Sequence, residues 1–170
     1  MFKRFLKNER GLTLIELLAV IVILGIIAAI AIPSIGGLID NSKKDAHVAN
    51  AQQMINAAKI AVTADKDLIP ANGKYTVLPL AYLENKGYLE TVKDPDGDAG
   101  TYKKGSDSSL TNQNADPKGE YSYVLIENKD TKLKYYVKLI NSSRGVFDKD
   151  DKAAVGEENL KRDAVNDIKK

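Results

Sequence analysis

The hydrophobic and polar positions of the chain begin with one long apolar run. Residues 17–39 read LLAVIVILGIIAAIAIPSIGGLI and carry no formal charge. As an α-helix, these 23 residues would extend over about 35 Å at about 1.5 Å per residue, enough to cross the hydrocarbon of a bilayer. The run therefore predicts a membrane-spanning helix.

A second helical pattern follows the apolar run. Apolar residues recur at steps of three and four positions, the spacing of one helix face, at Val48, Ala51, Ile55, Ala58 and Val62. We predict one helix over about 13–64, with Pro33 as the site of any bend. Its second half has a face to bury, most simply against a β-sheet. His47 is interpreted as a solvated or packed residue rather than a ligand.

The remainder alternates turn-rich segments with strand patterns. Residues 65–77 are expected to form a connector, and residues 79–86 a short helix that Gly87 ends. Residues 103–119 are polar, which predicts an exposed loop. The charged tail from Lys149 is expected either to form a short terminal helix or to be disordered.

The strongest strand pattern lies in residues 121–140. We predict strands over 121–127 and 132–140, joined by a four-residue hairpin connection at 128–131. In the second strand, alternation predicts a buried face with Leu133, Tyr135, Val137 and Leu139, and a solvated face with Lys132, Lys134, Tyr136 and Lys138. A third strand is expected around 145–147.

Charge is distributed unevenly along the chain. Residues 1–11 hold four of the 25 Lys and Arg residues, and the rest carries 21 cationic and 22 anionic side chains. Because residues 12–170 are nearly neutral, they are unlike a nucleic-acid-binding domain, which usually has a basic face. The cationic segment predicts that residues 1–11 stay in the cytoplasm and that the chain after Asp40 lies across the membrane.

Missing residue types exclude several kinds of site. The chain has no cysteine and one histidine, which excludes disulfides and thiolate zinc sites and argues against a histidine-based triad. No nucleophile–base–acid arrangement, phosphate-cradling glycine loop or metal cluster is visible in the sequence. We therefore expect a protein that is not an enzyme and uses no cofactor.

Three interpretations of the apolar run are open on its residues alone. It is a secretory signal cut after Ala31, a plain membrane anchor, or a segment in which Glu16 has a specific role. A carboxylate at membrane depth is unfavourable unless it is paired or near the interface, so a signal or a plain anchor gains nothing from Glu16. A capping box with Thr13 would explain only the local geometry.

The residues around Glu16 carry a family resemblance. Residues 11–18 read GLTLIELL, after a short basic leader and before an uninterrupted apolar helix. This segment resembles the class III signal of type IV pilins and pseudopilins, although family members most often have phenylalanine at the position of Leu12. The resemblance implies cleavage between Gly11 and Leu12, N-methylation of Leu12, and filament assembly through Leu12 and Glu16. It also implies the type IV pilin fold, an α+β fold in which a long N-terminal helix packs against a small antiparallel β-sheet.

Further expectations concern individual residues. By the resemblance, the Leu12 amino group and the Glu16 carboxylate would pair between neighbouring subunits. Gly25 and Pro33 either distort the helix as the subunit leaves the membrane or form a tolerated kink.

Asp94, Asp96 and Asp98 have the spacing that opens a calcium loop, but the glycine and glutamate of an EF-hand are missing. A solvated turn is therefore the favoured interpretation there, with calcium as the weaker one.

The resemblance implies a structural function. The expected role is the major pilin of a type IV pilus-like filament in adhesion, motility or DNA uptake, with a major pseudopilin of a type II secretion or competence system as the alternative. Implied partners are copies of the chain in a helical homopolymer, a prepilin peptidase/methyltransferase, an assembly-platform membrane protein and a motor ATPase; no nucleic-acid site is evident. The precursor is expected in the cytoplasmic membrane and the filament at the cell surface, and the missing cysteine favours a Gram-positive source.

These expectations divide the chain into six segments. They are a cleaved basic leader at 1–11, the transmembrane and filament-core half of the helix at 12–39, its amphipathic half at 40–64, a connecting loop with a short helix at 65–119, an antiparallel sheet at 120–148, and a charged tail at 149–170.

Overall fold

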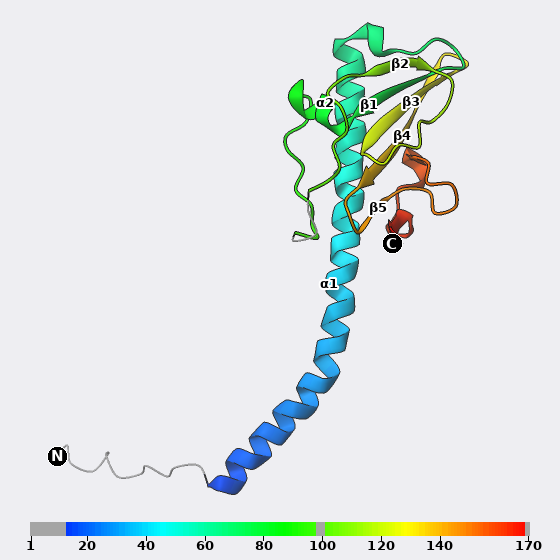
Figure 1. Ribbon diagram of the computed structural model, residues 1–170. Helices are drawn as coiled ribbons and strands as arrows, with labels where there is room; N and C mark the ends of the chain where they lie inside the picture. The colour runs from blue at the N-terminus through cyan, green and yellow to red at the C-terminus, as the bar shows by residue number, and fades with distance from the viewer. Residues whose placement is uncertain (1–12, 98–100, 169–170) are drawn as a thin grey trace, which may run out of the picture. The chain divides into compact units, whose positions relative to one another are not determined.

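A computed structural model describes residues 13–97 and 101–168 (Figure 1). The chain divides into two compact units, Met1–Asp40 and Asn41–Lys170. The first unit contains the apolar half of the long helix. The second contains the amphipathic half of that helix together with all the strands described below.

The long helix, α1, spans Leu14–Ala64, 51 residues, and confirms the predicted single helix. Pro33 lies inside it, so the helix continues although proline removes one backbone hydrogen bond. The helix ends where Asp65 adopts an extended backbone and begins the 3₁₀ turn Lys66–Leu68. The Asp65 carboxylate accepts a hydrogen bond from the Asp67 backbone N–H at 3.0 Å, which caps that turn.

Seven strands form one antiparallel sheet within the described residues. The order across the sheet is β2 (Leu110–Gln113), β1 (Tyr75–Pro79), β3 (Tyr123–Lys129), β4 (Lys132–Ile140), β5 (Arg144–Val146) and β7 (Val165–Asp167), and β6 (Val155–Gly156) pairs with β4. The short helix α2 (Leu80–Asn85) follows β1 directly, and 3₁₀ turns occupy Glu157–Asn159 and Arg162–Ala164. As predicted, Gly87 ends α2, with a φ of +75° that suits a residue without a Cβ.

The core of the second unit lies between the amphipathic half of α1 and the sheet. The buried apolar residues of α1 are Ala51, Met54, Ile55, Ala57, Ala58, Ala61 and Val62. They form one cluster with side chains of the central strands, including Leu78, Ile126 and Val137. Burying a large aliphatic side chain contributes about 1.5–3 kcal/mol, so this cluster is the main source of stability in the unit. The predicted packing of a long helix against a small antiparallel sheet is confirmed.

The hairpin between β3 and β4 differs from the prediction. Lys129 pairs with Lys132, so the connection has two residues, Asp130 and Thr131, rather than four. Their φ angles are +51° and +64°, the left-handed pair of a type I′ turn. The error arose because such turns usually contain glycine, and this one contains a β-branched residue instead.

Strands also lie outside the segment that was expected to form the sheet. The segment 65–119 contains β1 and β2, and β1 occupies an interior position between β2 and β3. The described part of the tail after Lys149 contributes β6, β7 and two 3₁₀ turns, so both expectations for it, a terminal α-helix and disorder, were wrong. Val155 and Val165 anchor this tail in the core. Single buried valines between charged residues give no periodic pattern, so the sequence did not indicate these strands.

Lys138 corrects the expectation of a solvated face on β4. Its residue exposure is 3%, whereas Lys132 and Lys134 on the same face are exposed. The Lys138 ammonium donates hydrogen bonds to the backbone carbonyls of Lys118 and Lys152. Two loops therefore cover this end of the strand, which alternation within β4 could not reveal.

Candidate functional site

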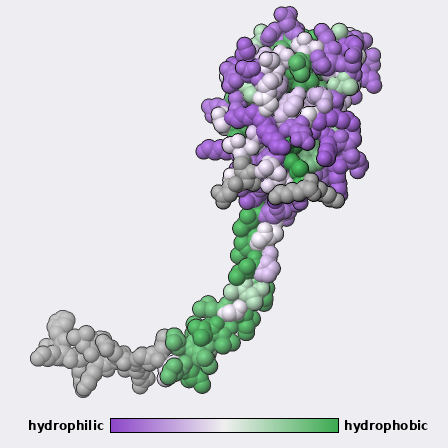
Figure 2. Space-filling model, in the orientation of Figure 1, coloured by the Kyte–Doolittle hydropathy of each residue, from purple (hydrophilic) through white to green (hydrophobic). Residues whose placement is uncertain are grey.

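The first half of α1 presents an apolar surface in the described structure. Every residue from Thr13 to Ile39 is exposed except Ala31, which is half-buried. Figure 2 shows these hydrophobic side chains gathered along the helix, while the second unit displays mainly hydrophilic ones. This is the one helix in the described chain long and apolar enough to cross a membrane, with a mean hydropathy of 3.0 over its best window. An apolar surface of this extent requires a cover, which a bilayer or neighbouring helices supply.

Thr13 and Glu16 form a reciprocal capping box at the start of α1. The Thr13 hydroxyl accepts a hydrogen bond from the Glu16 backbone N–H at 3.3 Å, and Glu16 Oε2 accepts from the Thr13 backbone N–H at 2.8 Å. The Thr13 hydroxyl also donates to Oε2 at 2.9 Å. Two N–H groups of the first turn are thereby satisfied. The capping interpretation of Glu16 is thus part of the structure, and it fixes where the carboxylate sits.

The remaining residues predicted for the N-terminal site have different outcomes. Gly11 and Leu12, predicted for cleavage, methylation and assembly, lie outside the described residues. Gly25 lies in continuous helix, and a Cβ added there would meet nothing within 4 Å. Helix distortion at Gly25 and Pro33 stays a prediction.

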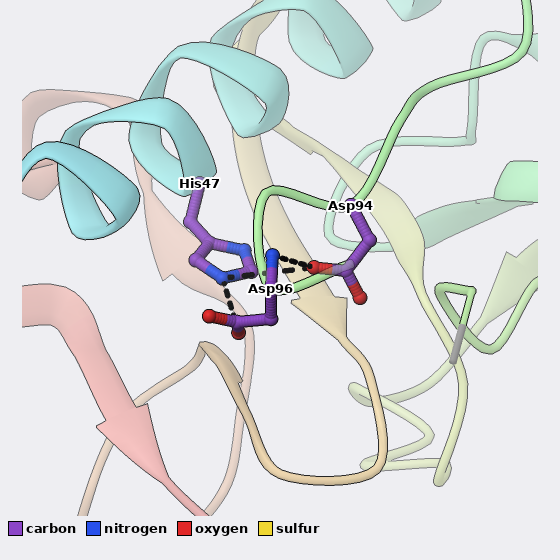
Figure 3. Close-up of side chains that lie close together, drawn as sticks. All are labelled: His47, Asp94 and Asp96. Carbon is purple, nitrogen blue, oxygen red and sulfur yellow. Dashed lines mark hydrogen bonds and ion pairs between the residues drawn. The ribbon is translucent and has the colours of Figure 1, made fainter. Parts of the chain in front are cut away.

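A buried polar cluster lies in the second unit, where Asp94 and Asp96 meet His47 of α1 (Figure 3). His47 is fully buried, and its Nε2 lies 3.0 Å from Asp96 Oδ2 and 3.9 Å from Asp94 Oδ1. Its Nδ1 lies 2.8 Å from the Tyr102 hydroxyl. The Tyr102 hydroxyl also accepts a hydrogen bond from the Asn50 side chain, so both ring nitrogens of His47 have a partner and the helix is tied to Tyr102.

One amide donor contacts both carboxylates, and two cations lie beside Asp96. The Asn141 side-chain amide donates to Asp94 at 2.8 Å and to Asp96 at 3.1 Å. Arg144 Nε lies 3.3 Å from Asp96, and Lys43 Nζ lies 3.8 Å from it. Burial raises the pKa of Asp96, but the His47 and Asn141 hydrogen bonds and the Arg144 charge outweigh burial and hold that pKa below its usual value.

This cluster connects three parts of the second unit. The turn with Asp94 and Asp96 is tied to α1 through His47 and to the β4–β5 region through Asn141 and Arg144. One ligand atom each of His47, Asp94 and Asp96 lies within 4.8 Å of the others, so the three could surround a cation. Asp98 lies outside the described residues. Calcium at this turn stays a prediction, and Asp96 already has Arg144 and Lys43 as cationic partners without it.

Sequence reasoning missed the part that His47 plays in this cluster. His47 lies one helical turn before Ala51 and therefore on the buried face of the helix. This spacing would have predicted that His47 is buried. Asn141 and Arg144, which contact the aspartates of the cluster, follow β4 more than 90 positions after His47, and nothing in the local pattern indicated that they approach this turn.

Comparison with known families bears on the apolar half of α1. Residues 6–32 match the prokaryotic N-terminal methylation motif. The chain carries the N-terminal methylation motif of the type IV pilin and pseudopilin family. Searches of curated proteins and of solved structures gave no match to this chain.

The motif includes the exposed first part of α1. It is the motif of type IV pilin-like subunits, whose N-terminal leader is cleavable and methylated, and the fold is a pilin-like α+β fold. Proteins of this family are structural rather than enzymes. The family implies processing by a prepilin peptidase, a membrane-anchored precursor and a surface filament.

Proposed function

We propose that the chain is the major pilin of a type IV pilus-like filament. The observation that carries this proposal is the apolar half of α1, which no part of the described chain covers. A bilayer can cover it before assembly, and the same half of neighbouring copies can cover it afterwards. A contact that repeats from copy to copy without closing generates a helical filament.

Assembly starts with cleavage between Gly11 and Leu12 in this proposal. The cut frees an α-amino group at Leu12, which the peptidase/methyltransferase then methylates. The Leu12 cation and the Glu16 carboxylate are then the formal charges at the head of an apolar helix. Each is unfavourable alone in a core of packed helices, so their pairing between neighbouring copies sets the axial offset of one helix against the next.

The geometry of Glu16 supports this pairing. Both capping hydrogen bonds to the carboxylate end on Oε2. Oε1 accepts no hydrogen bond from the residues that the structure describes. The cap therefore orients the carboxylate while leaving one oxygen for an amino group of another copy.

The wider assembly follows from the same proposal. An assembly-platform membrane protein and a motor ATPase extract the subunit from the cytoplasmic membrane, and the filament reaches the cell surface. The near-neutral net charge of the second unit fits adhesion or motility better than direct DNA binding. If the chain instead forms a short filament that serves a secretion or competence system, it is a major pseudopilin.

The proposal is tested by replacing Glu16. We expect Glu16→Ala to leave cleavage intact, because the cut lies four residues away from the altered side chain. We expect it to reduce surface filaments by about tenfold or more, because removing one partner of a buried pair costs about 3–5 kcal/mol. Glu90→Ala, which removes an exposed carboxylate from the second unit, is the matched control and should not change the filament count.

Two measurements read out this experiment. Mass spectrometry should find N-methyl-Leu12 as the first residue in both variants, and micrographs should show filaments only for Glu90→Ala and the parent chain. An unchanged filament count in Glu16→Ala refutes the pairing. A mature chain that begins at Ile32 refutes the filament function altogether, because it indicates a secretory signal. Long sheared filaments distinguish a pilus from a pseudopilus.

A further inference from the structure

The second unit also contains a cavity that the proposed function does not use. A cavity of about 500 Å³ lies where the end of β4 meets the segments 118–120, 147–152 and 165–168. Its apolar wall includes the buried side chains of Ile140, Phe147 and Val165. Pockets that hold small ligands have volumes of about 300–1,000 Å³ and similar apolar walls.

The charges around this cavity are mostly positive. Lys103, Lys118, Lys138, Lys149 and Lys152 line it, against two carboxylates, Glu120 and Asp167. Among the described residues, Lys118 is the lysine of this group that has a carboxylate partner, because its ammonium lies 2.9 Å from Asp151. A concave site with an excess of one charge concentrates ligands of the opposite charge.

Lys138 differs from the other lysines because it is buried. Its exposure is 3%, and its ammonium donates to the carbonyl oxygens of Lys152 at 2.6 Å and Lys118 at 3.4 Å. An ammonium has three N–H donors, so two carbonyls leave one for a further acceptor. No carboxylate of the described residues lies within ion-pair distance of it. Burial lowers the pKa of Lys138, as expected for a cation that has lost water without gaining an anion in contact.

The two carbonyls that hold Lys138 belong to unusual backbone positions. Lys118 has a φ of +48° and Lys152 a φ of +59°, a conformation that residues with a Cβ rarely adopt. Asp116 holds both loops in place, because its carboxylate accepts from the backbone N–H of Lys118 and of Ala154, each at 2.8 Å. The Lys138 ammonium is therefore positioned by the fold before any ligand arrives.

We propose that this cavity binds a phosphate monoester that carries a small apolar group. The phosphate accepts hydrogen bonds from Lys138 and from the exposed lysines at the rim of the cavity, Lys103 and Lys149. Its two negative charges balance the excess of positive charge that the lysines give the cavity. The apolar group lies against Ile140, Phe147 and Val165. A phosphate in contact with Lys138 supplies the anion that this buried cation lacks.

Calorimetric titration of the full chain in non-ionic detergent tests the proposal with phenyl phosphate as the probe. We expect saturable binding of phenyl phosphate, binding of inorganic phosphate about tenfold weaker because the ring is missing, and no binding of phenol. Benzoate should bind more weakly than phenyl phosphate because it has one charge. Absence of phenyl phosphate binding, or equal binding of benzoate, overturns the proposal.

Variants locate the binding site. Lys138→Met should weaken phenyl phosphate binding by about tenfold or more, the effect of losing a charge-assisted hydrogen bond. Lys132→Met removes an exposed lysine from the same strand outside the cavity and should bind as the parent chain does. If Lys138→Met does not fold, the rim variant Lys103→Gln/Lys149→Gln decides, with an expected loss of about fivefold or more. Equal loss in Lys132→Met and in the cavity variants overturns the assignment.

Discussion

The two halves of α1 are built from the same residue types but have opposite surroundings. In the first half, Ile27 and its neighbours are more than half exposed, and no other part of the described chain covers them. In the second half, Ile55 is fully buried against the sheet. Helix propensity and hydrophobicity are therefore not what distinguishes the halves. The second half is covered within one chain, whereas no described residue covers the first half.

Polar groups follow the same division. In the second half, His47 is buried and has partners on both ring nitrogens, and Asp45 forms two hydrogen bonds with Arg162. In the first half, Glu16 has a capping partner for one carboxylate oxygen only. Glu16 is exposed, so its second carboxylate oxygen is accessible to solvent or to a group outside the chain.

The largest expected effect is a difference in the free energy of unfolding between variants in the two halves of α1. Ile55→Ala should lower the free energy of unfolding of the second unit by about 2–5 kcal/mol, because it leaves a cavity in the core. The matched change Ile27→Ala should leave that free energy unchanged. All eight tyrosines lie between residues 75 and 136, so tyrosine fluorescence during urea unfolding reports on the second unit alone. An equal loss in both variants would contradict the division.

A smaller loss is expected from the buried cluster. His47→Ala should destabilise the second unit by about 1–3 kcal/mol, because Asp96 and Tyr102 each lose a buried hydrogen-bond partner. Gln53→Ala, at an exposed position of the same half of α1, should change little. The same urea unfolding experiment measures both variants. Equal stability of His47→Ala and the parent chain would show that the cluster does not tie the turn to the helix.

The pKa of Asp96 gives the cluster a pH dependence. Because this pKa is lower in the folded chain than its usual value, the stabilisation is complete above the unfolded value of about 3.9 and is lost as the pH falls through the folded value. Asp96→Asn should therefore lose less stability than the parent chain on acidification below about pH 4. Urea midpoints at a series of pH values measure this, and the exposed Asp107→Asn should follow the parent chain.

The smallest effect is expected in the β3–β4 turn. Thr131 has a φ of +64°, so Thr131→Gly should stabilise the second unit by about 0.5–1 kcal/mol by relieving left-handed strain. Thr131→Ala keeps a Cβ and should bring no such gain. Thermal unfolding followed by circular dichroism distinguishes the two. A gain of the same size in both variants would show that the strain lies elsewhere.

The sequence was informative where a periodic pattern was long. The bounds of α1 and β4 followed from repeated apolar spacing, and α2 followed from its flanking proline and glycine. β1 was missed although Thr76 and Val77 favour a strand, because five residues between turn signals give too short a pattern. β7 and the burial of Lys138 depend on contacts between distant segments, which no local pattern records.

The candidate sites divide in the same way. Thr13 and Glu16 are three residues apart, so a local rule predicted their hydrogen bonds. His47 and Asp96 are 49 positions apart, and the sequence suggested a solvated turn where the structure has a buried cluster. The lysine-lined cavity joins segments from Lys103 to Ile168 and had no counterpart in the sequence reasoning.

The most direct test of the central claim is thiol labelling of intact filaments. The chain has no cysteine, so Ile27→Cys places a single thiol in the apolar half of α1, and Lys132→Cys places one at an exposed position of β4. If copies of the apolar half cover one another, a water-soluble maleimide labels Lys132→Cys at once and Ile27→Cys only after the filaments are dissolved in denaturant. Labelling of Ile27→Cys in intact filaments at the rate of Lys132→Cys would contradict the claim.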